Sequence, residues 1–530
     1  MKFNTLLALG LVVIGVAPIQ AQFTASNVTL YKQYTLSQLS ASSGNSCWGY
    51  VSPSGREYAL MGCNNKTAFV EITDPANPVY FASVSHLSGS WSDIKTYGSV
   101  AYVGTEESGS GVQVIDLSNI DNHVVTLTRT ITSPGRTHTL HVDNVSGFLY
   151  TCGSRQGTGT TMCFSLANPL NPVRVGLNSL TGSFYQHETL VITFPSGPYA
   201  GRQIMFSGGE DRGLEIWDVT NKNSVTLVRR VSYPFVGYCH QSWISSDYKY
   251  LYVNDELDED SFPGQVPLTR TLVFDVSVLE TADLVSTFST NKTSIDHNLY
   301  WKNDFIFEGN YTTGINVFDA TTNPLSPTLR GFFDTYPSNN NPTFNGLWSN
   351  YPFFPSGTVI GGDINRGLFI WDVSEATKTN FSTATVTAER GRVLAGGIPE
   401  LGAQDGQYYV VGKGVVVNPS EAPIRVVFEG VSRWSDVSKL KFNLRHKVNS
   451  ANLEQTVELF DWTTGTWVLT TTNAAPLADT TFTLNGPNPD RFIEAGTKKM
   501  RARLQLRTVG PTTLSDWGTS IDLVNWTLNP

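Results

Sequence analysis

The sequence LEIWDVTN at residues 214–221 is one copy of a pattern that returns along the whole first part of the chain, and this repetition predicts the fold. It is a short apolar run, typical of a β-strand, that ends in an acidic residue and a polar turn. Six copies end in an aspartate and a degraded seventh, CFSLANPLNP at 163–172, has leucine there: Asp74, Asp116, Leu166, Asp218, Asp275, Asp319 and Asp372. Successive positions lie 42, 50, 52, 57, 44 and 53 residues apart. Short strands at this spacing predict an all-β, seven-bladed β-propeller.

The repeat around residues 239–288 shows how one blade divides into strands. Its inner, second, third and outer strands are expected at 239–244, 248–254, 270–275 and 284–288. After the last copy, LFIWDVS at 368–374, no outer strand follows. The segment VTLYK at 28–32 resembles VTLVR at 225–229, which belongs to an outer strand. We therefore expect a strand at 28–34 to pair with residues 367–372 and to cover two sheet edges.

The chain divides into four predicted segments. Residues 1–21 have an apolar run and a small-residue end at Ala21, which predicts a signal peptide and a secreted, extracellular protein. Residues 22–378 are the expected propeller, and the Thr/Ser-rich segment 379–392 is interpreted as a linker that could have strand character. Residues 393–530 contain alternating runs such as KLKFNLR at 439–445, which predict a jelly-roll-like β-sandwich.

Composition limits the partners of this protein. A net charge of −9, with 15% charged residues, excludes the basic surface that nucleic acid requires. No later apolar run reaches the length of about 18 residues that predicts a membrane span. The expected partners are an extracellular protein or polysaccharide, with the domain attached to or near a cell surface.

Five cysteines are present, and secretion permits disulfide bonds. Cys47 and Cys63 flank a strand–turn–strand, as do Cys152 and Cys163, so each pair could form a bridge across adjacent strands. Buried reduced thiols are the alternative for both pairs.

Several ordered motifs resemble one family of secreted propellers. They are TLHVD at 139–143, GGEDRGLEIWDV at 208–219, HQSWISSDYKYLYVNDELDE at 240–259 and GLFIWDVS at 367–374. Together with the apolar runs that end in aspartate, this pattern resembles the LVIVD repeat and the choice-of-anchor B family over residues 27–378. The resemblance implies a secreted bacterial propeller that can be joined to different surface anchors. It implies no established biochemical activity.

Four histidines stand at the starts of predicted inner strands: His138, His187, His240 and His297. Inner strands of a propeller begin at one rim of the central channel, so four consecutive blades would present imidazoles there. Neutral imidazole nitrogens bind divalent transition metals well. The alternative is that these side chains only form hydrogen bonds with neighbours and water.

Two functions follow from this pattern. The first is a cell-surface binding module with an unassigned ligand. The second is a metal-dependent enzyme, in which Glu188 or Asp93 would transfer protons beside the metal. Propellers support both functions, so the fold does not choose between them.

A weaker candidate site is the acidic loop 254–260, NDELDED. Its carboxylates could bind calcium, although the spacing of an EF-hand loop is absent. A solvated acidic loop is the alternative interpretation.

Overall fold

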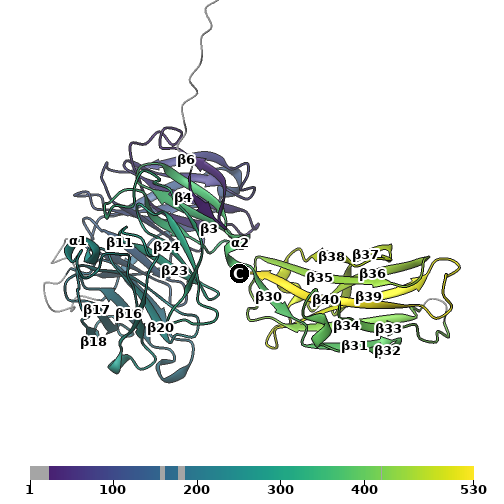
Figure 1. The fold of residues 1–530 in the computed structure, drawn as a ribbon. Coiled ribbons are helices and arrows are strands. Elements are labelled where there is room, and N and C mark those ends of the chain that lie inside the picture. Colours follow the sequence, from purple (N-terminus) through teal and green to yellow (C-terminus); the bar gives the residue numbers. More distant parts are fainter. Residues whose placement is uncertain (1–22, 155–160, 177–184, 419–420) are drawn as a thin grey trace, which may run out of the picture.

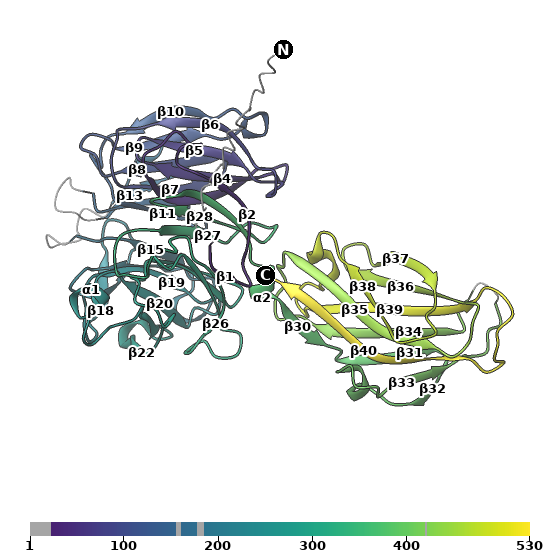
Figure 2. The same cartoon turned by 45° about the horizontal axis from the view of Figure 1, so that its top comes forward.

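The computed structural model describes residues 23–154, 161–176, 185–418 and 421–530, and it is built almost entirely of antiparallel β-strands (Figures 1 and 2). The predicted all-β class is confirmed. The figures show two parts, a group of small sheets up to residue 372 and two longer sheets beyond it. The predicted signal peptide at 1–21 lies outside the described residues.

The motif LEIWD forms the third strand of a four-stranded, propeller-like sheet. This sheet consists of β15 (Thr189–Thr193), β16 (Gln203–Gly208), β17 (Leu214–Asp218) and β18 (Thr226–Val231). All of β17 is buried except Asp218, whose carboxylate accepts a hydrogen bond from the backbone N–H of Thr220 at 2.9 Å. This aspartate turn ends the strand and directs the chain to the outer strand.

The other five aspartates of the repeat, Asp74, Asp116, Asp275, Asp319 and Asp372, form the same turn. In each, the carboxylate accepts the backbone N–H of the residue two positions later, at 2.8–3.1 Å. The repeated aspartate is therefore explained by local turn chemistry rather than by ligand binding.

Six further sheets of the same layout occur between residues 25 and 372. The first three contain β3 (Gly44–Val51), β4 (Glu57–Cys63), β5 (Lys66–Glu71) and β6 (Val79–Ser85); β7 (Ser92–Tyr97), β8 (Val100–Thr105), β9 (Val112–Asp116) and β10 (Thr126–Ile131); and β11 (Thr139–Asp143), β12 (Phe148–Cys152), β13 (Met162–Ser165) and β14 (Val173–Arg174). The other three contain β19 (Cys239–Ile244), β20 (Tyr250–Asp255), β21 (Thr271–Asp275) and β22 (Asp283–Phe288); β23 (Asn298–Lys302), β24 (Phe305–Gly309), β25 (Ile315–Asp319), β26 (Thr328–Phe333) and β1 (Ala25–Ser26); and β27 (Leu347–Tyr351), β28 (Thr358–Asp363), β29 (Gly367–Asp372) and β2 (Thr29–Tyr34).

The first strands of these sheets are neighbours in space. β3, β7, β11, β15, β19, β23 and β27 contact one another in chain order, and β27 also contacts β3. Helical segments are short: α1 (Asp258–Ser261), α2 (Ser374–Thr377) and the 3-10 turns Ile120–Asn122, Gly197–Tyr199, Leu279–Thr281, Pro399–Leu401 and Pro489–Phe492. In the described part of the chain, no helix has the length and apolar character to span a membrane.

The N-terminal strand pairs where the sequence predicted. β2 lies antiparallel to β29, with Thr29 opposite Asp372 and Tyr34 opposite Leu368. The preceding β1 pairs with β26 of the neighbouring sheet, and Val28, between the two strands, is 4% exposed. The first described residues thus join the last two of the small sheets.

Two long sheets lie face to face in the C-terminal part. One contains β32 (Arg392–Ala395), β33 (Tyr409–Gly412), β40 (Gly518–Asn529), β35 (Lys439–Val448) and β38 (Thr480–Asn485), with β30 (Thr379–Ser382) also paired to β40. The other contains β31 (Thr385–Arg390), β34 (Ile424–Val431), β39 (Lys499–Thr508), β36 (Leu453–Asp461) and β37 (Thr466–Ala474). Phe428 of β34 and Phe442 of β35 pack across the gap, with ring centroids 6.2 Å apart.

The segment 379–392 has the strand character that its sequence left open, and it belongs to the two long sheets rather than forming a separate linker. It contains β30, which pairs with β40, and β31, which pairs with β34. Threonine favours strands because it is β-branched. Polar, threonine-rich residues at the edge of a sheet therefore resemble a linker in composition alone.

The suggested disulfides are also wrong. All five cysteines lie within the described ranges and are buried free thiols. Strand register explains this result, because Cys47 faces Met61 rather than Cys63, and Cys163 faces Tyr150 rather than Cys152. Each suggested pair is offset by two positions along adjacent strands.

We predict that removal of residues 23–34 lowers the unfolding temperature and causes association at high protein concentration. The deletion exposes the edges of β26 and β29, which then can pair with another chain. Val28→Ala should cost about 1.5 kcal/mol, from the loss of two methyl groups at about 0.8 kcal/mol each. Differential scanning calorimetry and light scattering measure both effects. An unchanged unfolding temperature in the deletion variant would contradict this role of the N-terminal strand.

We predict that His446 makes folding dependent on pH. The buried ring hydrogen-bonds Thr519 at 3.0 Å and Gln455 at 2.5 Å, and burial lowers its pKa to about 4. Between an unfolded pKa of about 6.5 and the folded value, the unfolded chain binds more protons, so stability falls as pH falls. The loss attributable to His446 should be about 2 kcal/mol at about pH 5. Denaturant unfolding of the wild type and His446→Gln at pH 7 and pH 5 measures it; equal losses in both proteins would refute the assignment.

Candidate functional site

The four predicted histidines meet at one end of the innermost strands. His138, His187 and His297 stand just before β11, β15 and β23, and His240 lies in β19. Their rings form a continuous row, with centroids 4.1 Å apart for His138 and His187, 4.3 Å for His187 and His240, and 4.2 Å for His240 and His297. All four are buried. Their convergence follows from the repeat, since each side chain occupies an equivalent place in consecutive sheets.

Nitrogen atoms at one end of this row face each other directly. His138 Nε2 and His187 Nε2 are 3.0 Å apart. The opposite ring nitrogens have partners of their own, because His138 Nδ1 lies 3.0 Å from Glu106 and His187 Nδ1 lies 2.9 Å from the Tyr238 hydroxyl. Such outer partners fix the orientation of an imidazole and leave its other nitrogen available.

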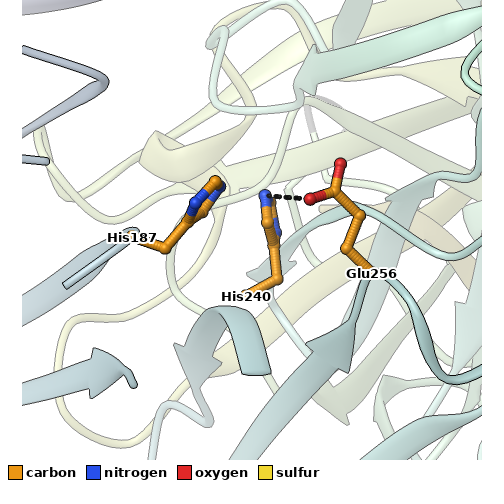
Figure 3. A group of neighbouring side chains, drawn as sticks. All are labelled: His187, His240 and Glu256. Atoms are coloured by element: carbon orange, nitrogen blue, oxygen red, sulfur yellow. Dashed lines mark ion pairs between the residues drawn. The ribbon is translucent and has the colours of Figure 1, made fainter. Parts of the chain in front are cut away.

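A carboxylate joins the row from the loop after β20. Figure 3 shows His240 between His187 and Glu256. His187, His240 and Glu256 each offer one ligand atom, and these three atoms all lie within 4.8 Å of one another. Glu256 lies 3.8 Å from His240 Nε2 and 3.3 Å from His297 Nε2, and it accepts a hydrogen bond of 2.6 Å from the Tyr311 hydroxyl.

The hydrogen bond of His297 defines which of its nitrogens carries a proton. Its Nδ1 lies 2.6 Å from the backbone oxygen of Trp348, and a carbonyl oxygen can only accept. In a neutral ring, Nε2 therefore presents a lone pair toward Glu256 Oε1. Two acceptors facing at 3.3 Å require a proton or a cation between them.

Burial favours neutral rings in the middle of the row. It lowers the pKa of His187 and His240 well below the usual value, and the neighbouring histidines lower it further. Burial also acts to lower the pKa of His138, but the hydrogen bond and charge of Glu106 outweigh it and raise that pKa. Neutral imidazole is the form that binds metal ions.

The two predicted proton-transfer residues lie on the inner side of the histidines, where Asp93, Glu188 and Lys95 line a small cavity. Both oxygens of Asp93 accept hydrogen bonds, from Lys95 at 2.9 and 2.7 Å, Ser46 at 2.9 Å and the Leu140 N–H at 2.8 Å. These bonds argue against Asp93 as a base. The carboxylate of Glu188 accepts a hydrogen bond from the side-chain amide of Asn298 at 3.3 Å. Burial raises the pKa of Glu188 to about 7.

A pocket of about 420 Å³ lies on the other side of the histidines. Its wall is largely aromatic and acidic, and comprises Trp91, Glu106, His138, Tyr185, His187, Glu210, Tyr238, Glu256, Phe344 and Trp348. An aromatic pocket with a few convergent polar groups is the usual form of a small-ligand site.

Sequence reasoning missed Glu106, Glu210 and Glu256 as members of this site. Glu106 and Glu256 directly follow β8 and β20, and Glu210 follows β16 by two positions. Second strands run antiparallel to first strands, so they end where the first strands begin. An acid repeated after second strands was therefore the available signal.

The loop 254–260 is only partly an acidic surface loop. Asp260 is exposed, whereas Asp258 and Glu259 are buried and approach Asp296 to form a second group that could hold a metal ion. Asp255 accepts hydrogen bonds from the Tyr233 hydroxyl and from the N–H groups of Gly237 and Tyr238. The structure thus contains two groups with suitable ligand atoms, one rich in nitrogen and one made only of carboxylates.

Comparisons with known proteins identify no family. No family model matches the chain, and no curated protein matches it. Solved structures with some similarity include U3-55K, with 8% identity over 65% of this chain and 98% of that one and a TM-score of 0.40. A functionally unknown protein from Desulfotomaculum acetoxidans has 12% identity, coverage of 56% and 87%, and a TM-score of 0.40. The computationally designed Ika8 protein has 13% identity, coverage of 59% and 80%, and a TM-score of 0.36. With TM-scores below 0.5, these similarities carry no argument.

Proposed function

We propose that residues 25–372 form a closed, seven-bladed β-propeller with a metal-dependent site at one mouth of its channel. Closure is supported by the contacts of the first strands in chain order, including β27 with β3, and by the pairing of β2 with β29. Secretion and membership in the LVIVD-repeat, choice-of-anchor B family are part of the proposal. They rest on the predicted signal peptide and on the sequence motifs.

A divalent transition-metal ion binds to His187, His240 and Glu256, with His138 as an additional ligand. The observation that carries this proposal is the set of three ligand atoms within 4.8 Å of one another. Two nitrogens bound tetrahedrally to one ion at about 2.1 Å are about 3.4 Å apart. His138 Nε2 and His187 Nε2, at 3.0 Å, are close to that separation. Three imidazoles and one carboxylate suit zinc, iron, copper or nickel rather than calcium or magnesium.

The pocket beside the histidines favours metal-dependent enzyme chemistry. Both Glu256 and His187 line it, so an ion held there would be accessible to water and to a ligand in the pocket. Such an ion would polarise a bound substrate or lower the pKa of water. Glu210 is the better proton-transfer candidate on this side, because Glu188 faces the inner cavity.

The aromatic wall supports a second function, the capture of an extracellular ligand without chemistry. Trp91, Tyr185, Phe344 and Trp348 provide large apolar faces around the acidic groups. These faces suit an extracellular protein side chain or a sugar of a polysaccharide.

We predict that the wild type, purified without chelator and without a metal-affinity tag, retains about one transition-metal ion per chain. His240→Ala and His187→Ala should lose it, since each variant removes one ligand of the set. His123→Ala is the matched control, because His123 is partly exposed and pairs with Glu71 elsewhere. Elemental analysis by mass spectrometry gives the stoichiometry, and circular dichroism reports the fold. The proposal would be refuted if the wild type still contained no metal after incubation with zinc, iron, copper and nickel.

We predict that Glu106→Gln weakens metal binding about 10- to 100-fold without abolishing it. The carboxylate lies 3.0 Å from His138 Nδ1 and would orient this ligand and increase its basicity. The neighbouring variant Glu107→Gln, outside the pocket, should leave affinity unchanged. Competition with a chromogenic chelator gives both dissociation constants. Equal affinity in Glu106→Gln and wild type would exclude His138 from the ligand set.

A further inference from the structure

Three carboxylates are buried together beside the histidine site. Asp258 and Glu259 begin α1, and Asp296 precedes β23 in the next sheet. They are 0%, 2% and 0% exposed, and one oxygen of each lies within 4.8 Å of the other two. The group therefore links two neighbouring sheets.

Four carboxylate oxygens in this group have no hydrogen-bond donor. They are Asp258 Oδ1, Asp296 Oδ1 and both oxygens of Glu259. The remaining two are occupied, since Arg270 donates to Asp258 Oδ2 at 2.8 and 2.6 Å and Asn254 donates to Asp296 Oδ2 at 2.5 Å. Glu259 is thus a buried side chain that points into the group with neither oxygen satisfied.

The charge of the group is only partly balanced. Over the described ranges of the chain, the ion pair of Arg270 with Asp258 is the one salt bridge that the three acids form. A buried charge without a partner is strongly destabilising. Burial, with repulsion from Asp258, raises the pKa of Asp296 well above its usual value. Glu259 and Asp296 therefore need either protons or a cation.

We propose that Asp258, Glu259 and Asp296 bind a calcium ion. The available ligand atoms are all oxygens. Zinc and copper prefer nitrogen and sulfur ligands, so this group does not suit them. Calcium accepts several carboxylates directly in irregular geometry, whereas magnesium requires near-octahedral geometry and retains several waters. A buried group of carboxylates from two separate segments fits calcium better.

The bound ion would connect to the histidine site through the chain itself. Glu256 lies two residues before Asp258, and Tyr238, whose hydroxyl contacts His187, accepts the N–H of Glu256 through its backbone oxygen at 3.0 Å. Calcium that fixes α1 would therefore hold Glu256 against His240 and His297. This connection rests on the proposed metal function, whereas calcium binding itself does not.

Calorimetric titration of the EDTA-dialysed full chain with CaCl₂ tests the proposal. We expect one site per chain, with a dissociation constant between about 10⁻⁶ and 10⁻³ M, and an unfolding temperature that rises with calcium but not with equal magnesium. Glu259→Gln and Asp296→Asn should each weaken binding at least about tenfold. Glu259→Gln should also raise the unfolding temperature of the calcium-free protein, because a neutral amide does not have to take up a proton in order to be buried.

Asp260→Asn is the matched control, since it removes one exposed charge from the same helix and should not change calcium affinity. No binding by the wild type up to about 10 mM calcium would overturn the proposal. Unchanged calcium affinity in both site variants, or stabilisation by magnesium alone, would also overturn it. Calcium binding by His240→Ala separates the two sites, because this variant should lose the transition metal and keep calcium. If the wild type binds calcium but no transition metal, only the proposed function fails.

Discussion

The innermost strands of the small sheets all begin at the same end, and this constraint determines which side chains meet there. In each of the small sheets, the first strand begins at the same end, and its antiparallel partner ends there. One end of the array therefore collects residues from two sources, the starts of first strands and the ends of second strands. The first source supplies the histidines, and the second supplies Glu106, Glu210 and Glu256. No long-range rearrangement of the chain is needed to bring imidazoles and carboxylates together.

This constraint explains which features the sequence could predict. The aspartate turns and the four histidines recur at equivalent positions, so a periodic pattern locates them without any knowledge of register. The N-terminal strand was predictable for a related reason, since the last repeat lacked one strand and residues 28–32 matched that strand in another repeat. The acids after the second strands belong to the same periodicity. They fall on variable loops, however, where the neighbouring residues differ from one repeat to the next.

Features that depend on register or on nonlocal partners could not be predicted in this way. The suggested cysteine pairs fail because the two cysteines of each pair lie two positions out of register on adjacent strands. Asp93 has a repeat-related position and a suitable side chain, yet Lys95, two residues later, occupies both of its oxygens. The segment 379–392 contains edge strands whose pairing partners lie up to 149 residues away, at Leu528 opposite Thr379. Composition cannot distinguish such an edge from a linker.

Burial has a different effect on the stability of the two groups of possible metal ligands. A buried imidazole can remain neutral, and burial itself lowers the pKa of His187 and His240, so this row can fold without an ion. Carboxylates become neutral only by taking protons, and in their group four oxygens already lack a donor. A cation is thus optional for folding at the histidines and favourable for folding at the acids. The short stretch from Glu256 to Glu259 joins the two groups, so a calcium ion at the acids would help to hold in place the carboxylate that His240 and His297 share.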